Sequence, residues 1–171
     1  MGVVFLSIAR AVARSTRILC PRALGVAEMG YMAERPDLLV YTDGASRNNP
    51  GRAASGYAIF RPTGEELERN ARCIGVTTNN VAEYEALLWA IERASGYTDG
   101  SVLFHSDSEL MVRQVSGRYQ VKKDHLKELV ARVQVAAGAF HRFRIVHVPR
   151  EDPRIELVDG LVNDALDREG F

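Results

Sequence analysis

Residues 38–51 read Leu-Leu-Val-Tyr-Thr-Asp-Gly-Ala-Ser-Arg-Asn-Asn-Pro-Gly. The apolar run 38–42 predicts a buried strand that ends at Asp43 and Gly44, and the turn-forming residues 46–51 predict a loop after it. An Asp that ends a strand is commonly a turn former. The carboxyl end of a strand in an open α/β sheet is also where ligands bind, so a functional role for this acid stays open.

Strand-like and helix-like patterns follow one another along the rest of the chain. Further strands are predicted at 55–61, 69–76, 101–106 and 143–148, the first two joined by a short turn. Helical spacing of apolar residues predicts helices at 80–94, 108–116, 124–137 and 156–168. The element order βββαβααβα predicts an α/β fold, a five-stranded mixed sheet with helices packed on its faces.

Length, composition and charge point to one ordinary globular domain. The chain has 171 residues, of which 46% are hydrophobic and 26% charged, values that exclude wholesale disorder and a coiled coil. Residues 1–31 hold four arginines and one acid, which leaves 18 basic and 21 acidic residues in the remainder. This slightly acidic balance argues against a large basic surface for nucleic acid, so any such contact must be local.

An N-terminal extension, residues 1–35, is expected to precede a folded domain at 36–171. Its apolar residues alternate with arginines, a pattern that fits an amphipathic organellar presequence. Met29 and Met32 stand just before the first predicted strand, so an over-called start site is the simpler interpretation. We expect a cytoplasmic protein, with organellar targeting as the alternative.

Neither a membrane span nor a disulfide is expected. The longest uncharged apolar run, near 2–9, is far shorter than the roughly 20 residues that cross a bilayer. Cys20 and Cys73 are the only cysteines, too few and too far apart for a zinc ribbon or a disulfide scaffold. The prediction is therefore a protein of a reducing compartment with no membrane partner.

Acidic residues at unusual places are the candidates for chemistry. Asp43 and Asp107 each end an apolar strand, and Asp159 is expected to open the last helix. Glu83 lies on the helix that begins near 80, beside the buried apolar stripe. Each acid also has an ordinary interpretation, as a turn former, a helix-capping acid or a surface residue.

Several carboxylates at one sheet edge would repel one another without a cation. Hard oxygen ligands of this kind suit Mg²⁺ or Mn²⁺, and a pair of such ions is an established device for phosphodiester hydrolysis. No zinc-ligand spacing, phosphate-binding Gly-Lys-Ser/Thr loop or Gly-x-Ser-x-Gly elbow is present. The absence of these motifs reduces the number of competing catalytic classes.

Four short motifs, in this order, carry a resemblance to a known family. They are Tyr-Thr-Asp-Gly-Ala-Ser-Arg-Asn-Asn-Pro-Gly at 41–51, Thr-Asn-Asn-Val-Ala-Glu-Tyr at 78–84, His-Ser-Asp-Ser at 105–108 and Val-Asp-Gly-Leu-Val-Asn at 158–163. Together they resemble type 1 ribonuclease H over about 38–166. The short stretch 116–123 is similar to the compact branch of that family, which lacks a basic handle insertion.

The resemblance implies a ribonuclease H-like fold and an endoribonuclease that cleaves the RNA strand of RNA–DNA hybrids. It implies two ions of Mg²⁺ or Mn²⁺, and the metal-binding catalytic acids would be Asp43, Glu83, Asp107 and Asp159. The RNA–DNA hybrid would be the partner of a monomeric enzyme. A catalytically impaired hybrid-binding module on the same fold is the alternative, and a protein-interaction domain is a more distant one.

The resemblance also suggests residues that contact the hybrid. The candidates are Gly44, Ala45, Asn49, Thr78, Asn79 and Asn80. Backbone near Gly44 and Ala45 would meet 2′-hydroxyl groups of the RNA, and Asn49 would meet the DNA strand. The group at 78–80 would contact phosphate or a base edge from a helix N-terminus, although plain helix capping is an equal alternative. Arg150 and Asn163 are possible auxiliary residues.

Three departures from the family pattern bear on these expectations. Asn48 stands where a Gly is usual, and Asn tolerates the left-handed conformation that this place requires. Ile155 and Val158 replace usual residues of the last motif, and 152–154 is expected to lengthen the connection before it. The fourth acid is therefore the least certain ligand, and this motif is the one hint of an impaired enzyme.

Overall fold

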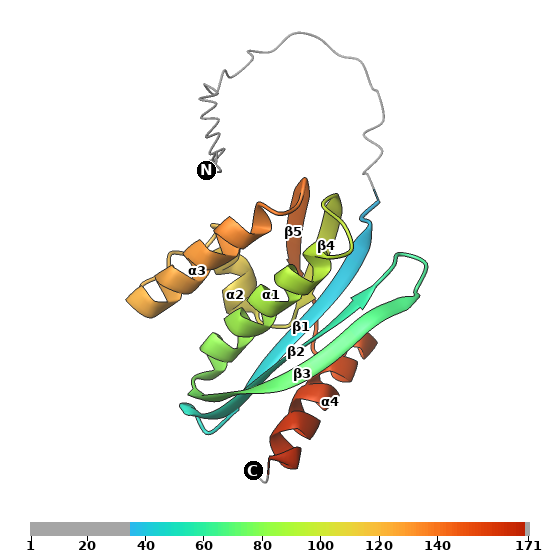
Figure 1. Ribbon diagram of the computed structural model, residues 1–171. Helices are drawn as coiled ribbons and strands as arrows, with labels where there is room; N and C mark the ends of the chain where they lie inside the picture. The colour runs from blue at the N-terminus through green and yellow to red at the C-terminus, as the bar shows by residue number, and fades with distance from the viewer. Residues whose placement is uncertain (1–34, 170–171) are drawn as a thin grey trace, which may run out of the picture. The chain divides into compact units, whose positions relative to one another are not determined.

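A computed structural model describes residues 35–169, and within them five strands form one sheet in the order β3-β2-β1-β4-β5 (Figure 1). The elements are β1 Leu38–Arg47, β2 Gly51–Phe60, β3 Glu66–Thr77, α1 Asn79–Ser95, β4 Ser101–Ser106, α2 Glu109–Val115, α3 Asp124–Ala137, β5 Arg142–His147 and α4 Pro153–Arg168. The predicted element order and mixed sheet are confirmed. The predicted extension lies outside the described residues, except for Arg35, and so does Cys20.

β1 is the central strand, and it has a different kind of neighbour on each side. It pairs antiparallel with β2 from Leu39 to Arg47, and β2 continues the meander into β3. On its other side it pairs parallel with β4, but only from Leu38 to Thr42, where β4 ends at Ser106. β5 then pairs parallel with β4. The second half of β1 therefore has no strand on its β4 side.

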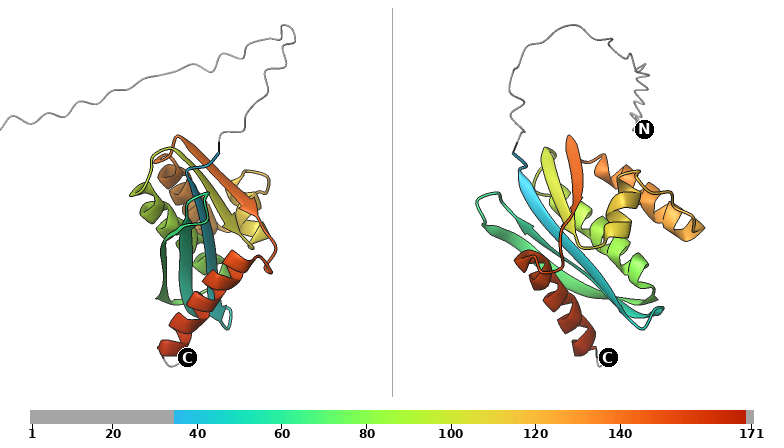
Figure 2. Two further views of the ribbon diagram at one scale, coloured as in Figure 1. Left: turned by 90° about the vertical axis from the view of Figure 1, so that its right-hand side faces the viewer. Right: turned by 180° about the vertical axis from the view of Figure 1, so that it is seen from behind.

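The two faces of the sheet carry separate hydrophobic cores because side chains alternate along each strand. Val40 and Tyr57 belong to the core that also contains buried residues of α1 and α3. Tyr41 and Ala58, the next residues of the same strands, belong to the core formed with α4. The side view in Figure 2 shows α4 on the opposite side of the sheet from α1. Any residue of β1 therefore faces α1 or α4 according to its place in this alternation.

Several predicted boundaries were wrong, and β2 and β3 begin at Gly51 and Glu66 rather than at 55 and 69. β1 does not end at Thr42 but continues to Arg47, because β2 provides hydrogen-bond partners along its whole length. α4 begins at Pro153 rather than 156, so 152–154 is not a longer connection. Asp152 accepts a hydrogen bond from the Arg154 N–H as the N-cap, and Pro follows it at the first helical position, a combination that starts helices.

Two further local predictions, at Asn48 and Thr78, are confirmed. Asn48, in the hairpin between β1 and β2, has a φ of 71°, the left-handed conformation expected there. The Thr78 hydroxyl caps α1 by accepting from the Val81 N–H. Cys73 is a free thiol. None of the helices within residues 35–169 has the length and apolar character needed to cross a membrane.

A polar cluster links β2, β3 and the C-terminal part of α1. Arg93 donates from Nε and Nη2 to the two carboxylate oxygens of Glu68, at 2.9 and 3.1 Å. The hydroxyls of Tyr57 and Tyr97 donate to the same carboxylate. These hydrogen bonds, above all those from Arg93, lower the pKa of Glu68 to about 2. The cluster is stable only while this carboxylate is ionised.

We predict that this cluster makes stability fall at acidic pH. The folded pKa lies below the ordinary 4.5, so the stabilisation is present above pH 4.5 and is lost as the pH falls towards 2. With the Glu68 side chain 18% exposed, solvent screening reduces the effect to about 1–2 kcal/mol. Urea unfolding should show Glu68→Gln destabilised at pH 7 and nearly equal to wild type at pH 2.5. Glu66→Gln is the control, and an equal loss there would contradict the prediction.

Candidate active site

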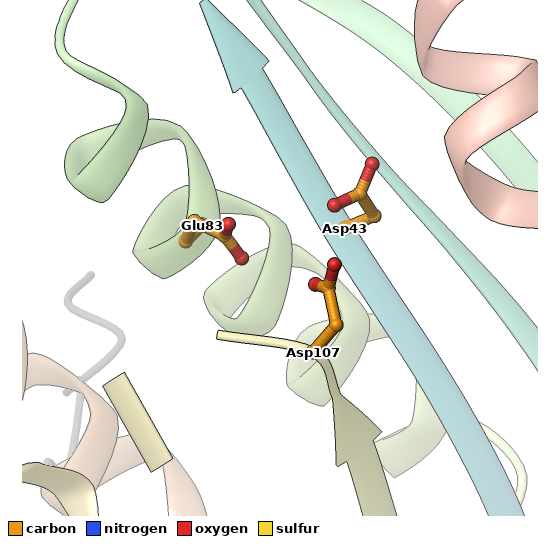
Figure 3. Close-up of side chains that lie close together, drawn as sticks. All are labelled: Asp43, Glu83 and Asp107. Carbon is orange, nitrogen blue, oxygen red and sulfur yellow. The ribbon is translucent and has the colours of Figure 1, made fainter. Parts of the chain in front are cut away.

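Three acids from three separate elements meet at one place beside the sheet. Asp43 comes from β1, Glu83 from α1, and Asp107 follows the end of β4 (Figure 3). One carboxylate oxygen of each lies within 4.8 Å of those of the other two. Asp43 and Glu83 are 5% and 6% exposed, whereas Asp107 is half-buried. The structure thus brings together three of the four acids that the sequence singled out.

The end of β4 allows acids from opposite faces of the sheet to meet. Side chains alternate along β1, so Asp43 lies on the same face of the sheet as Tyr41, which packs towards α4. Glu83 belongs to α1, which covers the other face. Because β4 stops at Ser106, opposite Thr42, no strand separates the two carboxylates. Asp107, the next residue after β4, then completes the group from that open side.

Gly44 lets α1 approach β1 closely enough for this contact. A Cβ atom at Gly44 would lie 2.3 Å from the carbonyl carbon of Ala82 and 2.4 Å from the backbone nitrogen of Glu83. Both are main-chain atoms that cannot turn aside. Ser55 of β2 strengthens the same contact, since its buried hydroxyl donates to the Ala82 carbonyl at 2.8 Å. Ser55 was not among the predicted site residues. A polar residue at the start of an apolar predicted strand was the feature that could have indicated it.

Each of the three acids has one buried carboxylate oxygen without a hydrogen-bond partner. Within residues 35–169, four buried polar side-chain atoms have no partner, and three of them are Asp43 Oδ2, Glu83 Oε2 and Asp107 Oδ1. Burial, followed by the charges of Asp107 and Asp159, raises the pKa of Asp43 to about 7. Burial and the charge of Asp43 also raise the pKa of Glu83 well above its usual range.

A divalent cation resolves this arrangement. Unpartnered carboxylate oxygens that converge within a few ångströms are the hard ligands that Mg²⁺ and Mn²⁺ prefer. Asp43 holds its proton up to about pH 7 in the absence of metal, so binding of a cation must displace protons from the cluster. The donor set therefore fits a metal whose affinity increases with pH through neutrality.

Asp159 lies outside the three-acid cluster, although it is near enough for its charge to raise the pKa of Asp43. Asp159 was predicted to open α4, but the helix begins at Pro153 and Asp159 lies after its first turn. Its Oδ1 accepts from Arg150 Nη2 at 2.8 Å, and its Oδ2 accepts from Asn163 Nδ2 at 3.0 Å. Both carboxylate oxygens are thus engaged, and the role of Asp159 as a fourth metal ligand stays a prediction.

The predicted substrate residues surround the cluster on the side of α1 and the hairpin. Gly44 and Ala45 directly follow Asp43 in β1, and Asn49 is exposed in the β1–β2 hairpin. Thr78 is the N-cap of α1, so the capping interpretation holds for it. Asn79 and Asn80 form the first turn of the helix and are half-buried. No part of the structure tests their contact with a substrate.

Known proteins share this sequence and architecture. A family model described as "Reverse transcriptase-like" matches residues 41–165. Ribonuclease HI of Halobacterium salinarum is 36% identical over 127 residues, which are 74% of this chain and 63% of that protein. A bifunctional protein of Mycobacterium tuberculosis is 38% identical over 133 residues, 76% of this chain but only 35% of its own length. The chain thus spans less than two thirds of these curated relatives.

Solved structures agree with this match. The crystal structure of RNase H1 from Halobacterium salinarum has a TM-score of 0.73 at 36% identity, over 77% of this chain and 98% of that one. LC11-RNase H1 in complex with an RNA/DNA hybrid has a TM-score of 0.73 at 40% identity, over 77% and 98%. The sheet and its acidic cluster thus place the chain in the reverse transcriptase-like class. Within that class it belongs to the type 1 ribonuclease H family, as the four motifs implied.

Proposed function

We propose that the protein is an endoribonuclease that hydrolyses the RNA strand of RNA–DNA hybrids with two divalent metal ions. The observation that carries the proposal is the cluster of Asp43, Glu83 and Asp107, whose carboxylates converge and each keep one buried oxygen without a partner. LC11-RNase H1, which is 40% identical in sequence to this chain, has been solved in complex with an RNA/DNA hybrid. That complex supports a hybrid as the substrate.

The residues of the cluster fit the ions that this chemistry needs. Glu83 and Asp107 would complete one site together with Asp43, and Asp43 would share the second site with Asp159. Mg²⁺ and Mn²⁺ are both suitable for such carboxylates, and when bound they supply an activated water and stabilise the leaving oxygen. Arg150, which donates to Asp159 Oδ1, would orient this fourth ligand.

Selectivity for RNA would come from the backbone next to the acids. Gly44 and Ala45 lie in β1 directly after Asp43, so 2′-hydroxyl groups near the cleaved bond would reach main-chain atoms there. The exposed Asn49, in the neighbouring hairpin, would face the DNA strand. DNA lacks the 2′-hydroxyl, so duplex DNA would lose these hydrogen bonds.

The decisive test compares four labelled duplexes with Mg²⁺ or Mn²⁺ present. The expected result is cleavage of the RNA strand of an RNA–DNA hybrid, with double-stranded DNA left intact. Double-stranded RNA and a duplex with one ribonucleotide define the range of substrates. Hybrid binding by fluorescence anisotropy without cleavage would instead support the impaired binding module. Absence of both hybrid binding and Mn²⁺ binding would refute the proposal.

Arg150 is predicted to assist turnover through its charge and not as a proton carrier. Its hydrogen bond to Asp159 raises the pKa of the guanidinium further, so Arg150 stays protonated. Arg150→Ala should therefore reduce kcat by about tenfold, the usual scale for a residue that orients a metal ligand. It should also raise the pH at which activity begins, because the Arg150 charge lowers the pKa of Asp43. Arg150→Lys should keep part of the rate. Steady-state cleavage rates at several pH values test this role of Arg150. The control is Arg144→Ala, which replaces an exposed arginine of β5.

A further inference from the structure

We propose that Asn79 is a positioning residue that couples the β1–β2 hairpin to the metal-binding carboxylate of Glu83. This inference rests on the proposed function, because it concerns how the same site is assembled. Asn79 is the first residue of α1, and Glu83 lies one helical turn further on the same face. Its side chain can therefore reach back to β1 with one atom and along the helix to Glu83 with the other.

Both polar atoms of the Asn79 amide group have defined partners. Its Oδ1 accepts a hydrogen bond from the Ser46 backbone N–H at 3.2 Å, and its Nδ2 donates to Glu83 Oε1 at 3.3 Å. A backbone N–H can only donate, and an ionised carboxylate can only accept. The reverse orientation of the amide would place donor against donor and oxygen against carboxylate. The two partners therefore determine which way the amide group points.

The hairpin is bound to the start of α1 through further contacts. Asn49 Oδ1 accepts from the backbone N–H of Asn79 at 3.1 Å. The hydroxyl of Ser46 bonds to the carbonyl of Asn48 within the hairpin and to the carbonyl of Thr77, two residues before the helix. Asn79 is thus hydrogen-bonded to the hairpin through both its backbone and its side chain. A displacement of the hairpin would be transmitted to the orientation of Glu83.

The contact leaves Glu83 oriented for a cation. Oε1 is held by Asn79, while Oε2 is buried and has no partner within the described residues. One N–H of the Asn79 amide is left for another partner. The other bonds of this amide lie within the protein, so its main role is to position Glu83. Outer residues that orient metal ligands in this way commonly contribute strongly to metal affinity.

The test measures metal binding and cleavage in Asn79→Ala. Calorimetry on the full chain should show Mn²⁺ affinity reduced by about tenfold, with a similar fall in kcat and a smaller change in KM. Asn80→Ala is the matched control for metal affinity. It removes the same side chain from the next helix position, and the Asn80 side chain makes no hydrogen bond within residues 35–169, so its Mn²⁺ affinity should equal that of wild type.

The Asn79 side chain belongs to neither hydrophobic core, so the variant should keep its fold. Thermal unfolding verifies this, and Asn79→Ser, whose short side chain cannot reach both partners, is a second variant with the same expected loss. Wild-type Mn²⁺ affinity in both variants, with only KM raised, would overturn the inference and leave Asn79 as a substrate contact alone. If wild type fails to cleave hybrid, the proposed function fails, whereas the Mn²⁺ comparison still decides the role of Asn79.

Discussion

Replacing Asp43 with Asn should abolish cleavage, with kcat lowered by about a thousandfold or more. In the proposed mechanism Asp43 would bind both ions, and an amide is a weaker, uncharged ligand. Loss of the several kcal/mol that metal ions contribute to a transition state corresponds to a factor of this size. The measurement is single-turnover cleavage of a labelled hybrid, with hybrid binding followed separately by anisotropy.

The same variant should be more stable than wild type in metal-free buffer at pH 8. The folded pKa of Asp43, about 7, lies above its ordinary value of 3.8, so the folded protein keeps a proton that the unfolded chain loses. Wild-type stability therefore falls between about pH 4 and pH 7 by about 2–4 kcal/mol, and the variant, whose amide does not titrate, is free of this loss. At pH 4 the two proteins should be nearly equal.

Asp164→Asn is the control, because Asp164 is an exposed acid on α4. It should change neither the cleavage rate nor the pH dependence of stability. An Asp43→Asn variant that still cleaves hybrid at a tenth of the normal rate would exclude a metal-bridging role for Asp43. Loss of stability at pH 8 would show that the cluster is not a site of charge repulsion.

Gly44→Ala should both destabilise the protein and disable the site. The added methyl group would lie within 2.5 Å of main-chain atoms of Ala82 and Glu83, so β1 and α1 must move apart. Overpacking against backbone of this kind costs about 3 kcal/mol or more. The movement also carries Glu83 away from Asp43, so Mn²⁺ affinity and cleavage should fall together.

Gly160→Ala is the matched control for this substitution. Gly160 lies within α4, where a Cβ atom would meet nothing within 4 Å. The change should raise stability by about 0.5–1 kcal/mol, because alanine favours the helix more than glycine does. Urea unfolding and Mn²⁺ calorimetry measure both variants. Equal effects of the two substitutions would show that close backbone approach at Gly44 is not what assembles the cluster.

Local patterns in the chain were sufficient for most of the architecture. Apolar runs bounded by turn residues identified the strands, and helical spacing of apolar residues identified the helices, all in the correct order. The burial of Glu83 also followed from its place beside the apolar stripe of one helix. Only boundaries failed: α4 starts earlier because Asp152 and Pro153 act as a cap, and they were interpreted as part of a connection.

The meeting of the acids, by contrast, depends on contacts between distant segments. Asp43 and Glu83 come from opposite faces of the sheet, and they meet only because β4 ends beside Thr42. Asp159 is bound by Asn163, one turn further along its own helix, and also by Arg150, which precedes that helix and which the helical spacing does not reveal. Short-range periodicity determines which face a residue occupies. Where neighbouring strands end, and which side chains then reach one another, follows from strand register and helix docking, which no local segment of the chain contains.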